Sequence, residues 1–153
     1  MALSIDFISD VVCPWCYMGK RRLEAALVLY RERFPEREAP VVRWWPFELN
    51  PDIPAEGMDR AAYKFRKRGH STTKQEQIYA RQTGLGRELG IAFAFDKIAR
   101  QPNTLAAHIL IGLAGELDLQ DALAEAIFKA FFTDGEDLTR EDKLVRVAVG
   151  AGL

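Results

Sequence analysis

The sequence predicts an α/β fold that begins as a β-α-β unit and continues as a helical half. Residues 3–8 alternate between apolar and polar side chains, which is typical of a strand. An amphipathic helical pattern follows at 17–34, and a segment rich in β-branched and aromatic residues follows at 41–47. From Met58 onward the strand signal nearly vanishes, so we expect the rest of the chain to be helical.

The first helix is expected to pack through one apolar stripe. The members of this stripe recur at helical spacing and are Leu23, Leu27, Tyr30 and Phe34. Lys20, Arg21 and Arg22 lie off the stripe, which indicates a solvated helix face or, as the alternative, a basic surface that attracts an anionic substrate. Pro46 lacks an N–H donor, so the second strand is expected to end there or to lie at a sheet edge.

The helical half is expected to hold four or five helices. In chain order the segments are a short helix from Met58 to Gly69, a longer helix from Ser71 or Thr72 to Gly90, an extended piece over 91–95, and helices over 104–117, 120–132 and from Thr139 onward. Two apolar stripes are expected to face the core: Ala106, Leu110, Leu113 and Leu117, and then Leu123, Ile127, Ala130 and Phe131. In the last helix Thr139 is the expected cap, and Leu144, Val145 and Ala148 the expected apolar face.

A sheet of only two strands is marginal without a third strand or covering helices. The last residues, Gly150 to Leu153, also resemble the end of a helix that leads nowhere. We therefore expect the natural protein to continue and to return further strands to the first two. The alternative is that helices alone cover the short sheet.

Composition and charge exclude several classes of function. The chain has 153 residues, 48% of them hydrophobic, and a net charge of -1, so no basic field exists to attract nucleic acid. No apolar run approaches the roughly 20 residues that a membrane-spanning helix needs. The first residues lack the basic and apolar regions of a signal peptide, so we expect a cytoplasmic protein with no nucleic-acid or membrane partner.

Both cysteines of the chain lie in one Cys13-Pro14-Trp15-Cys16 segment, between the first strand and the first helix. Free backbone N–H groups and the helix dipole at this position favour a thiolate, and a second thiol three residues on can resolve a mixed disulfide. Pro14 fits the first helical position. The alternatives are half of a zinc site, for which only His70 and His108 could add histidine ligands, or a pair of inert core cysteines. We predict no metal.

Four segments in register resemble one family. They are Asp10-Val-Val-Cys-Pro-Trp-Cys-Tyr-Met-Gly-Lys-Arg-Arg-Leu23, Pro46-Phe-Glu-Leu-Asn-Pro-Asp52, Pro102-Asn-Thr-Leu-Ala-Ala-His108 and Ala130-Phe-Phe-Thr-Asp-Gly-Glu-Asp-Leu138. The chain is similar to the FrnE branch of the DsbA-like proteins, which is related to 2-hydroxychromene-2-carboxylate isomerases and kappa-class glutathione transferases. The resemblance covers essentially the whole chain.

The resemblance implies a thioredoxin fold interrupted by an α-helical insertion domain. Residues 1–51 would then form the N-terminal part of the thioredoxin-like domain, and residues 52–153 the insertion. The family closes its thioredoxin domain with two further strands and a helix, preceded by a cis-proline beside the first cysteine. Every proline here lies before Asn103, so this segment is missing. The family also usually has arginine where this chain has Ile109.

The resemblance implies protein disulfide oxidoreductase chemistry, with no bound cofactor beyond a redox-active Cys13–Cys16 disulfide. We expect Cys13 to be the exposed nucleophile and Cys16 the buried resolving thiol. Trp15 should point to solvent, where it could contact a substrate. Because Trp15 brings no positive charge, the pKa of Cys13 should fall below that of a free thiol, yet stay above the roughly 3.5 of DsbA.

Four further residues are candidates for substrate binding: Lys20, Asn50, Asn103 and His108. Each also has a purely structural interpretation. Lys20 would be a solvated lysine, and Asn50 and Asn103 would be turn or cap residues. His108 would be a hydrogen-bonded structural histidine, although it could also transfer protons. The basic segment 63–70 has the same two interpretations: a solvated face, or a rim that binds peptide or glutathione. Trp44, Trp45 and Phe47 are expected in the core.

The expected partner is a protein or small-molecule thiol or disulfide, with glutathione as a candidate co-substrate; the oligomeric state is left open. One rival function is a glutathione-dependent isomerase or transferase, whose members usually have serine in place of Cys13. A second rival is a redox-regulated module that binds client proteins and uses its cysteines only to sense oxidants. The complete Cys-x-x-Cys favours the oxidoreductase.

Overall fold

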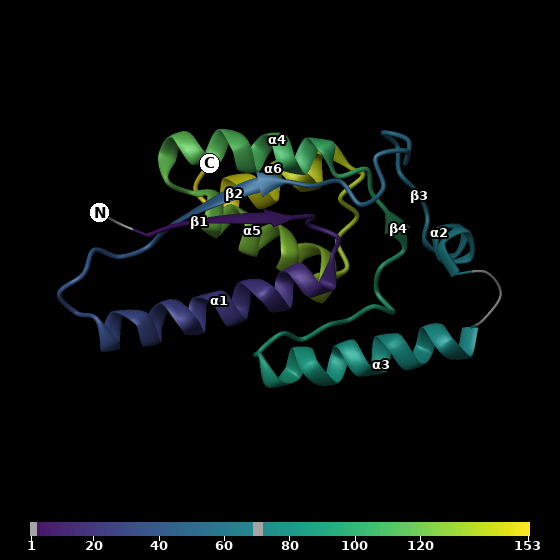
Figure 1. Ribbon diagram of the computed structural model, residues 1–153. Coiled ribbons are helices and arrows are strands. Elements are labelled where there is room, and N and C mark those ends of the chain that lie inside the picture. The colour runs from purple at the N-terminus through teal and green to yellow at the C-terminus, as the bar shows by residue number, and fades with distance from the viewer. Residues whose placement is uncertain (1–2, 69–71) are drawn as a thin grey trace.

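The computed structural model describes residues 3–68 and 72–153, with only the backbone of Arg68 and Thr72. Its first half is the predicted β-α-β unit: β1 (Ser4–Ser9), α1 (Pro14–Arg33) and β2 (Val41–Pro46). The two strands pair in parallel, with Ser4 opposite Val41 and Ser9 opposite Pro46. In Figure 1 the long helix α1 lies beneath this small sheet, and α4 lies above it.

The second half is mostly helical. Its elements are β3 (Met58–Asp59), α2 (Arg60–Arg68), α3 (Thr72–Glu88), β4 (Arg100–Gln101), α4 (Leu105–Ala114), a 3₁₀ turn (Gly115–Leu117), α5 (Gln120–Lys129), a π-helical turn (Ala130–Asp134) and α6 (Glu141–Gly150). Met58 was expected in a helix, but it pairs with Gln101 in a two-residue antiparallel ladder. Figure 1 shows α2 at one end of the molecule, and α3 beneath it, reaching the start of α1.

The core is built on aromatic side chains of α5 and the π-helical turn. Phe128, Phe131 and Phe132 are fully buried, and the ring of Tyr17 from α1 stacks on Phe128 with centroids 4.9 Å apart. Phe93, from the extended piece before β4, meets Phe132 edge to face at 5.3 Å. The same cluster includes Trp44 and Val11 of the β-α-β unit, so residues from both sides of the predicted domain boundary at 51/52 pack together. The boundary itself stays a prediction.

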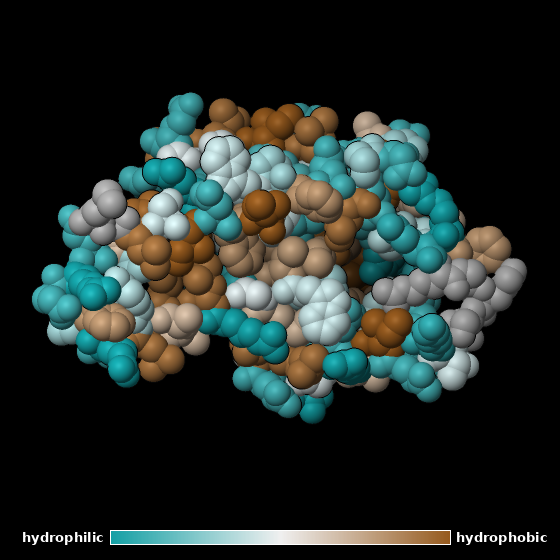
Figure 2. Space-filling model, in the orientation of Figure 1, coloured by the Kyte–Doolittle hydropathy of each residue, from teal (hydrophilic) through white to brown (hydrophobic). Residues whose placement is uncertain are grey.

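The predicted stripe on α5 is confirmed, because all four of its residues are buried. The predicted stripe on α4 is wrong. The buried residues of that helix are Ala107, His108, Ile111 and Ala114. Leu113 and Leu117 are 52% and 59% exposed. Figure 2 shows a hydrophobic surface over α4. Since α4 is apolar on both faces, its periodicity could not indicate which face meets the core.

Several smaller expectations also fail. Trp45 and Phe47 were expected in the core, but more than half of each side chain is exposed, and only Trp44 is buried. Thr139 does not cap the last helix, because its hydroxyl donates to Asp137 and the helix starts from Arg140. The caps expected at Gly69, Ser71 and Thr72 lie outside the described residues and side chains. No helix within residues 3–68 and 72–153 is long and apolar enough to cross a membrane.

Candidate functional site

The Cys-x-x-Cys segment forms the start of α1, as predicted. Cys13 is the N-cap residue with extended backbone, and Pro14 occupies the first helical position. The carbonyl of Cys13 accepts hydrogen bonds from the backbone N–H groups of Cys16 and Tyr17, at 3.0 and 3.2 Å. Both cysteines are free thiols in this structure. The strand-to-helix junction thus holds the two sulfurs where the positive end of the helix dipole acts.

The two thiols differ sharply in acidity. A hydrogen bond from the Cys16 thiol is the main reason that the pKa of Cys13 falls to about 7, and burial partly opposes it. The amides of Cys16 and Trp15 lower the pKa further, although neither makes a regular capping hydrogen bond. The same thiol–thiol hydrogen bond, burial and the negative charge on Cys13 raise the pKa of Cys16. Cys13 is therefore the sulfur that ionises first.

Exposure does not distinguish the two cysteines as the sequence led us to expect. Cys16 was expected to be buried and Cys13 open to solvent, but both side chains are half-buried. The two thiols differ instead in their roles in the shared hydrogen bond, because the thiol of Cys16 donates and the sulfur of Cys13 accepts. Trp15, between them, is 49% exposed, as expected.

A buried carboxylate lies immediately before the cysteines. Asp10 follows β1 and is 1% exposed; one of its oxygens accepts the backbone N–H of Leu49 at 2.7 Å. Its other oxygen lies 3.4 Å from Nε2 of His108, which is also buried. The negative charge of Asp10 raises the pKa of both cysteines, though it is the smallest of the effects on each. The sequence pointed to His108 but missed Asp10 as a functional residue, although Asp10 opened one of the quoted segments.

Lys20 is not on a solvated face, which corrects the first interpretation of the sequence. Its side chain is 3% exposed and its ammonium contacts three carboxylates, those of Glu24, Asp121 and Glu125. Burial alone would lower the pKa of Lys20, but these carboxylates outweigh it and raise the pKa. Lys20 thus joins α1 to α5, and its charge is balanced by carboxylates of the chain.

The two asparagines also make contacts within the chain. Asn103 uses both ends of its amide, donating to the carbonyl of Ile53 at 2.7 Å and accepting the N–H of Leu105 at 2.9 Å. Asn50 is buried and donates to the hydroxyl of Tyr63 at 3.3 Å, while its oxygen has no hydrogen-bond partner. Asn103 therefore fixes the turn before α4, and Asn50 links the loop after β2 to Tyr63 of α2.

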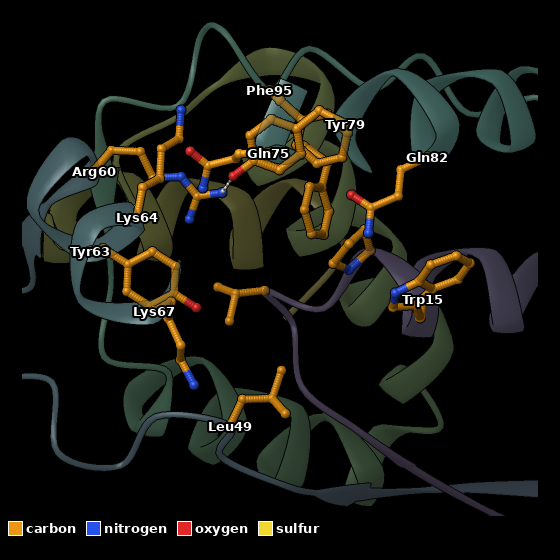
Figure 3. A pocket seen from close by; sticks show the side chains of 13 residues that line it. Trp15, Leu49, Arg60, Tyr63, Lys64, Lys67, Gln75, Tyr79, Gln82 and Phe95 are labelled. Atoms are coloured by element: carbon orange, nitrogen blue, oxygen red, sulfur yellow. Dashed lines mark hydrogen bonds between the residues drawn. The ribbon is translucent and has the colours of Figure 1, made fainter. Parts of the chain in front are cut away.

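A pocket of about 240 Å³ opens beside the Cys-x-x-Cys segment (Figure 3). Pro14 and Trp15, the two residues between the cysteines, line one side of it. Figure 3 shows Tyr63, Lys64 and Lys67 of α2 across from Trp15. Further lining residues are Val12, Leu49, Arg60, Gln75, Tyr79, Gln82, Phe95 and Phe132. The basic segment at 63–70 signalled part of this surface in the sequence, but Arg60, Tyr79 and Gln82 carried no signal.

The described residues hold no group of three or more His, Cys, Asp or Glu that could bind a metal ion. His108, one of the two histidines considered for zinc, instead lies beside Asp10. His70, the other, lies outside the described residues.

A β-α-β unit with a Cys-x-x-Cys at the start of its helix, extended by a helical half, defines a thioredoxin-type fold with a dithiol site. The DSBA-like thioredoxin domain matches residues 4–153, and the chain belongs to this family. The DsbA-like family and the thioredoxin fold expected from the sequence are thereby confirmed, while the FrnE branch stays a prediction.

Three relatives illustrate the similarity. The chain is 29% identical to a probable DsbA oxidoreductase, SCO1869 of Streptomyces coelicolor, with a TM-score of 0.86 over 99% of this chain and 63% of that one. It is 26% identical to the uncharacterized protein YwbO of Bacillus subtilis (strain 168), over 100% of this chain and 68% of that protein. A Nitrosomonas europaea protein, assigned provisionally to the protein disulfide isomerases, is 18% identical with a TM-score of 0.65, over 100% of this chain and 66% of that one, and shows the fold alone. The chain thus spans about two thirds of these relatives.

Proposed function

We propose that this protein is a thiol–disulfide oxidoreductase in which Cys13 is the nucleophile and Cys16 the resolving thiol. The observation that carries the proposal is that both thiols lie at the start of α1, where the thiol of Cys16 lowers the pKa of Cys13 to about 7 and the pKa of Cys16 itself is raised. At neutral pH about half of Cys13 is then thiolate, while Cys16 stays protonated until Cys13 has reacted. The similarity to the Streptomyces coelicolor DsbA oxidoreductase supports the same chemistry.

The reaction proceeds in two exchanges. The Cys13 thiolate attacks one sulfur of a substrate disulfide, forms a mixed disulfide and expels the other substrate sulfur as a thiolate. Cys16 then loses its proton and attacks the Cys13 sulfur, which releases the second substrate thiolate and leaves a Cys13–Cys16 disulfide. Two electrons pass from the protein to the substrate, and the reverse sequence oxidises a dithiol substrate. Substrates are proteins or small molecules with a thiol or disulfide, glutathione is a candidate co-substrate, and the expected setting is cytoplasmic.

Proton removal from Cys16 is the step for which Asp10 is suited. Once Cys13 is in the mixed disulfide, the thiolate that raised the pKa of Cys16 is gone, and the buried carboxylate beside it can accept the proton. His108, 3.4 Å from that carboxylate, is placed to pass the proton on.

The test is the redox equilibrium of Cys13 and Cys16 in glutathione buffers, read by mass spectrometry. We expect one cooperative transition to a species two hydrogens lighter, which is absent in Cys13→Ser. A stable glutathione adduct on Cys13 without an internal disulfide would contradict the proposal and favour the glutathione-dependent isomerase or transferase. Full protection of a client protein by Cys13→Ser would instead favour the redox-regulated binding module.

A further inference from the structure

The pocket beside the cysteines is lined by positively charged side chains and by no negatively charged one among the described residues. Three cations line it, Arg60, Lys64 and Lys67, and no carboxylate does. Among the residues that the structure describes, none of these three cations forms a salt bridge. Some basic residues elsewhere in the described chain are paired, as Lys20 is with Glu24, and Arg66, of the same helix as the three pocket cations, with Asp52 at 2.7 Å. The pocket therefore concentrates positive charge that no salt bridge within residues 3–68 and 72–153 compensates.

Arg60 is the most buried of the three cations. It is 8% exposed; its guanidinium donates to the side-chain oxygen of Gln101 and to the hydroxyl of Tyr79, both neutral partners, and its Nε has no partner. Gln82, another lining residue, is 3% exposed and its side-chain oxygen is also without a partner. A buried charge that no opposite charge balances is costly, and a bound anion would relieve that cost.

Lys64 adds a second charge close to Arg60. Its ammonium lies 5.2 Å from the centre of the Tyr79 ring, and no carboxylate contacts it within the described chain. Burial is the main reason that the pKa of Lys64 is lowered, and the nearby positive charge of Arg60 lowers it further. Aromatic rings of Trp15, Tyr63 and Tyr79 form much of the remaining wall and offer apolar surface to the rest of a ligand.

We propose that this pocket selects thiol and disulfide substrates that carry a carboxylate close to the reacting sulfur. The carboxylate binds among Arg60, Lys64 and Lys67, and the sulfur meets Cys13, because the two residues that separate the cysteines form the opposite wall. The inference rests on the proposed function and names the substrate class of that same site. Electron transfer is unchanged: one substrate disulfide takes up the two electrons released when Cys13 and Cys16 join.

The first test compares thiols that differ in charge as reductants of the Cys13–Cys16 disulfide. One arm uses 3-mercaptopropionate, 2-mercaptoethanol and cysteamine; the other uses end-blocked peptides with Glu, Gln or Lys beside a single cysteine. We expect the carboxylate-bearing thiol to react about tenfold faster per thiolate than its neutral counterpart in at least one arm. The arm with the larger ratio identifies the source of the carboxylate as a small molecule or a peptide. Equal rates in both arms would overturn the proposal.

Charge variants connect the preference to the pocket. In the double variant Lys64→Gln, Lys67→Gln the ratio of anionic to neutral rates should fall towards one. Lys74→Gln is the matched control, because it removes an exposed lysine of α3 that does not line the pocket, and it should keep the ratio. A ratio that survives the double variant would overturn the proposal.

Two measurements separate this proposal from the proposed function. If dithiothreitol, which is uncharged, does not reduce an internal disulfide, then the oxidoreductase function fails and the inference fails with it. If dithiothreitol works but charge has no effect, then only the pocket inference fails. A binding titration needs no turnover: an S-methylated Glu–Cys peptide should change tryptophan fluorescence at lower concentration than its Gln counterpart, and the change should vanish in Trp15→Phe.

Discussion

Nε2 of His108 lies 3.4 Å from Oδ1 of Asp10, and both side chains are buried. Asp10 lies three residues before Cys13, the N-cap residue of α1. The pair joins α4 to the end of β1, from positions 98 residues apart (108 − 10). It places one carboxylate charge next to the thiols, and this charge opposes their ionisation. The acidity of Cys13 thus depends mainly on the hydrogen bond from Cys16, which burial opposes and the carboxylate of Asp10 opposes more weakly.

The first prediction concerns the reactivity of Cys13. Iodoacetamide should alkylate it with a midpoint near pH 7, the pKa that the hydrogen bond from Cys16 produces. A lowered pKa increases the fraction of thiolate at pH 7, although it makes each thiolate a weaker nucleophile. The first effect is the larger, so the rate should exceed that of a free cysteine by a factor on the order of five. Cys16→Ala, which removes the donor, should move the midpoint upward. Cys16→Ser keeps a donor at the same position and should move it less; a midpoint unchanged in Cys16→Ala would refute this explanation.

The second prediction isolates the charge of Asp10. Asp10→Asn removes that charge but keeps an oxygen for the N–H of Leu49, so the pKa of Cys13 should fall, as read from the pH dependence of its alkylation. Asp6→Asn removes an exposed charge from β1, the strand that Asp10 follows, and serves as the control, with no change expected. If proton transfer also depends on Asp10, then Asp10→Asn should slow release of a trapped mixed disulfide on Cys13. An equal response in both variants would show that only long-range charge matters.

The third prediction concerns Lys20. Lys20→Met should lower the free energy of unfolding by about 1–3 kcal/mol, because it leaves the carboxylates of Glu24, Asp121 and Glu125 facing one another without their cation. Denaturant unfolding measures this loss, and Arg22→Met, at an exposed position of the same helix, is the control. The alkylation midpoint of Cys13 should stay unchanged in Lys20→Met. A shifted midpoint with normal stability would restore the substrate-binding interpretation of Lys20.

The fourth prediction links the thiols to stability. The folded pKa of Cys13, about 7, lies below its ordinary value of 9.0, so its contribution is fully present above pH 9 and is lost as the pH falls through 7. The pKa of Cys16 is raised in the folded protein, so Cys16 lowers the free energy of unfolding as the pH rises above 9. In urea unfolding, the free energy of unfolding of the reduced protein should therefore increase between pH 7 and 9, relative to that of a Cys13→Ala, Cys16→Ala double variant. A constant difference across this range would contradict the lowered pKa.

The sequence predicted the parts of the fold that depend on neighbouring residues. The β-α-β unit, the position of Pro14 and Cys13 at the start of α1, and the apolar face of α5 follow from alternation, helical spacing and helix-end chemistry. The face of α4 was mispredicted because that helix is apolar all round. Spacing indicates that a helix has faces, but the neighbours in space decide which one is buried.

Local sequence by itself determined that this chain carries a dithiol at a helix N-terminus, because the thiols, the proline and the free N–H groups all lie within a few residues. Only the tertiary structure decided the surroundings of that dithiol. It brought His108 to Asp10, paired Lys20 with Asp121 and Glu125, and set the cations of α2 opposite Trp15. The physical reason is that a charge is solvated, paired or unbalanced according to what packs against it, and those partners lie tens of residues away.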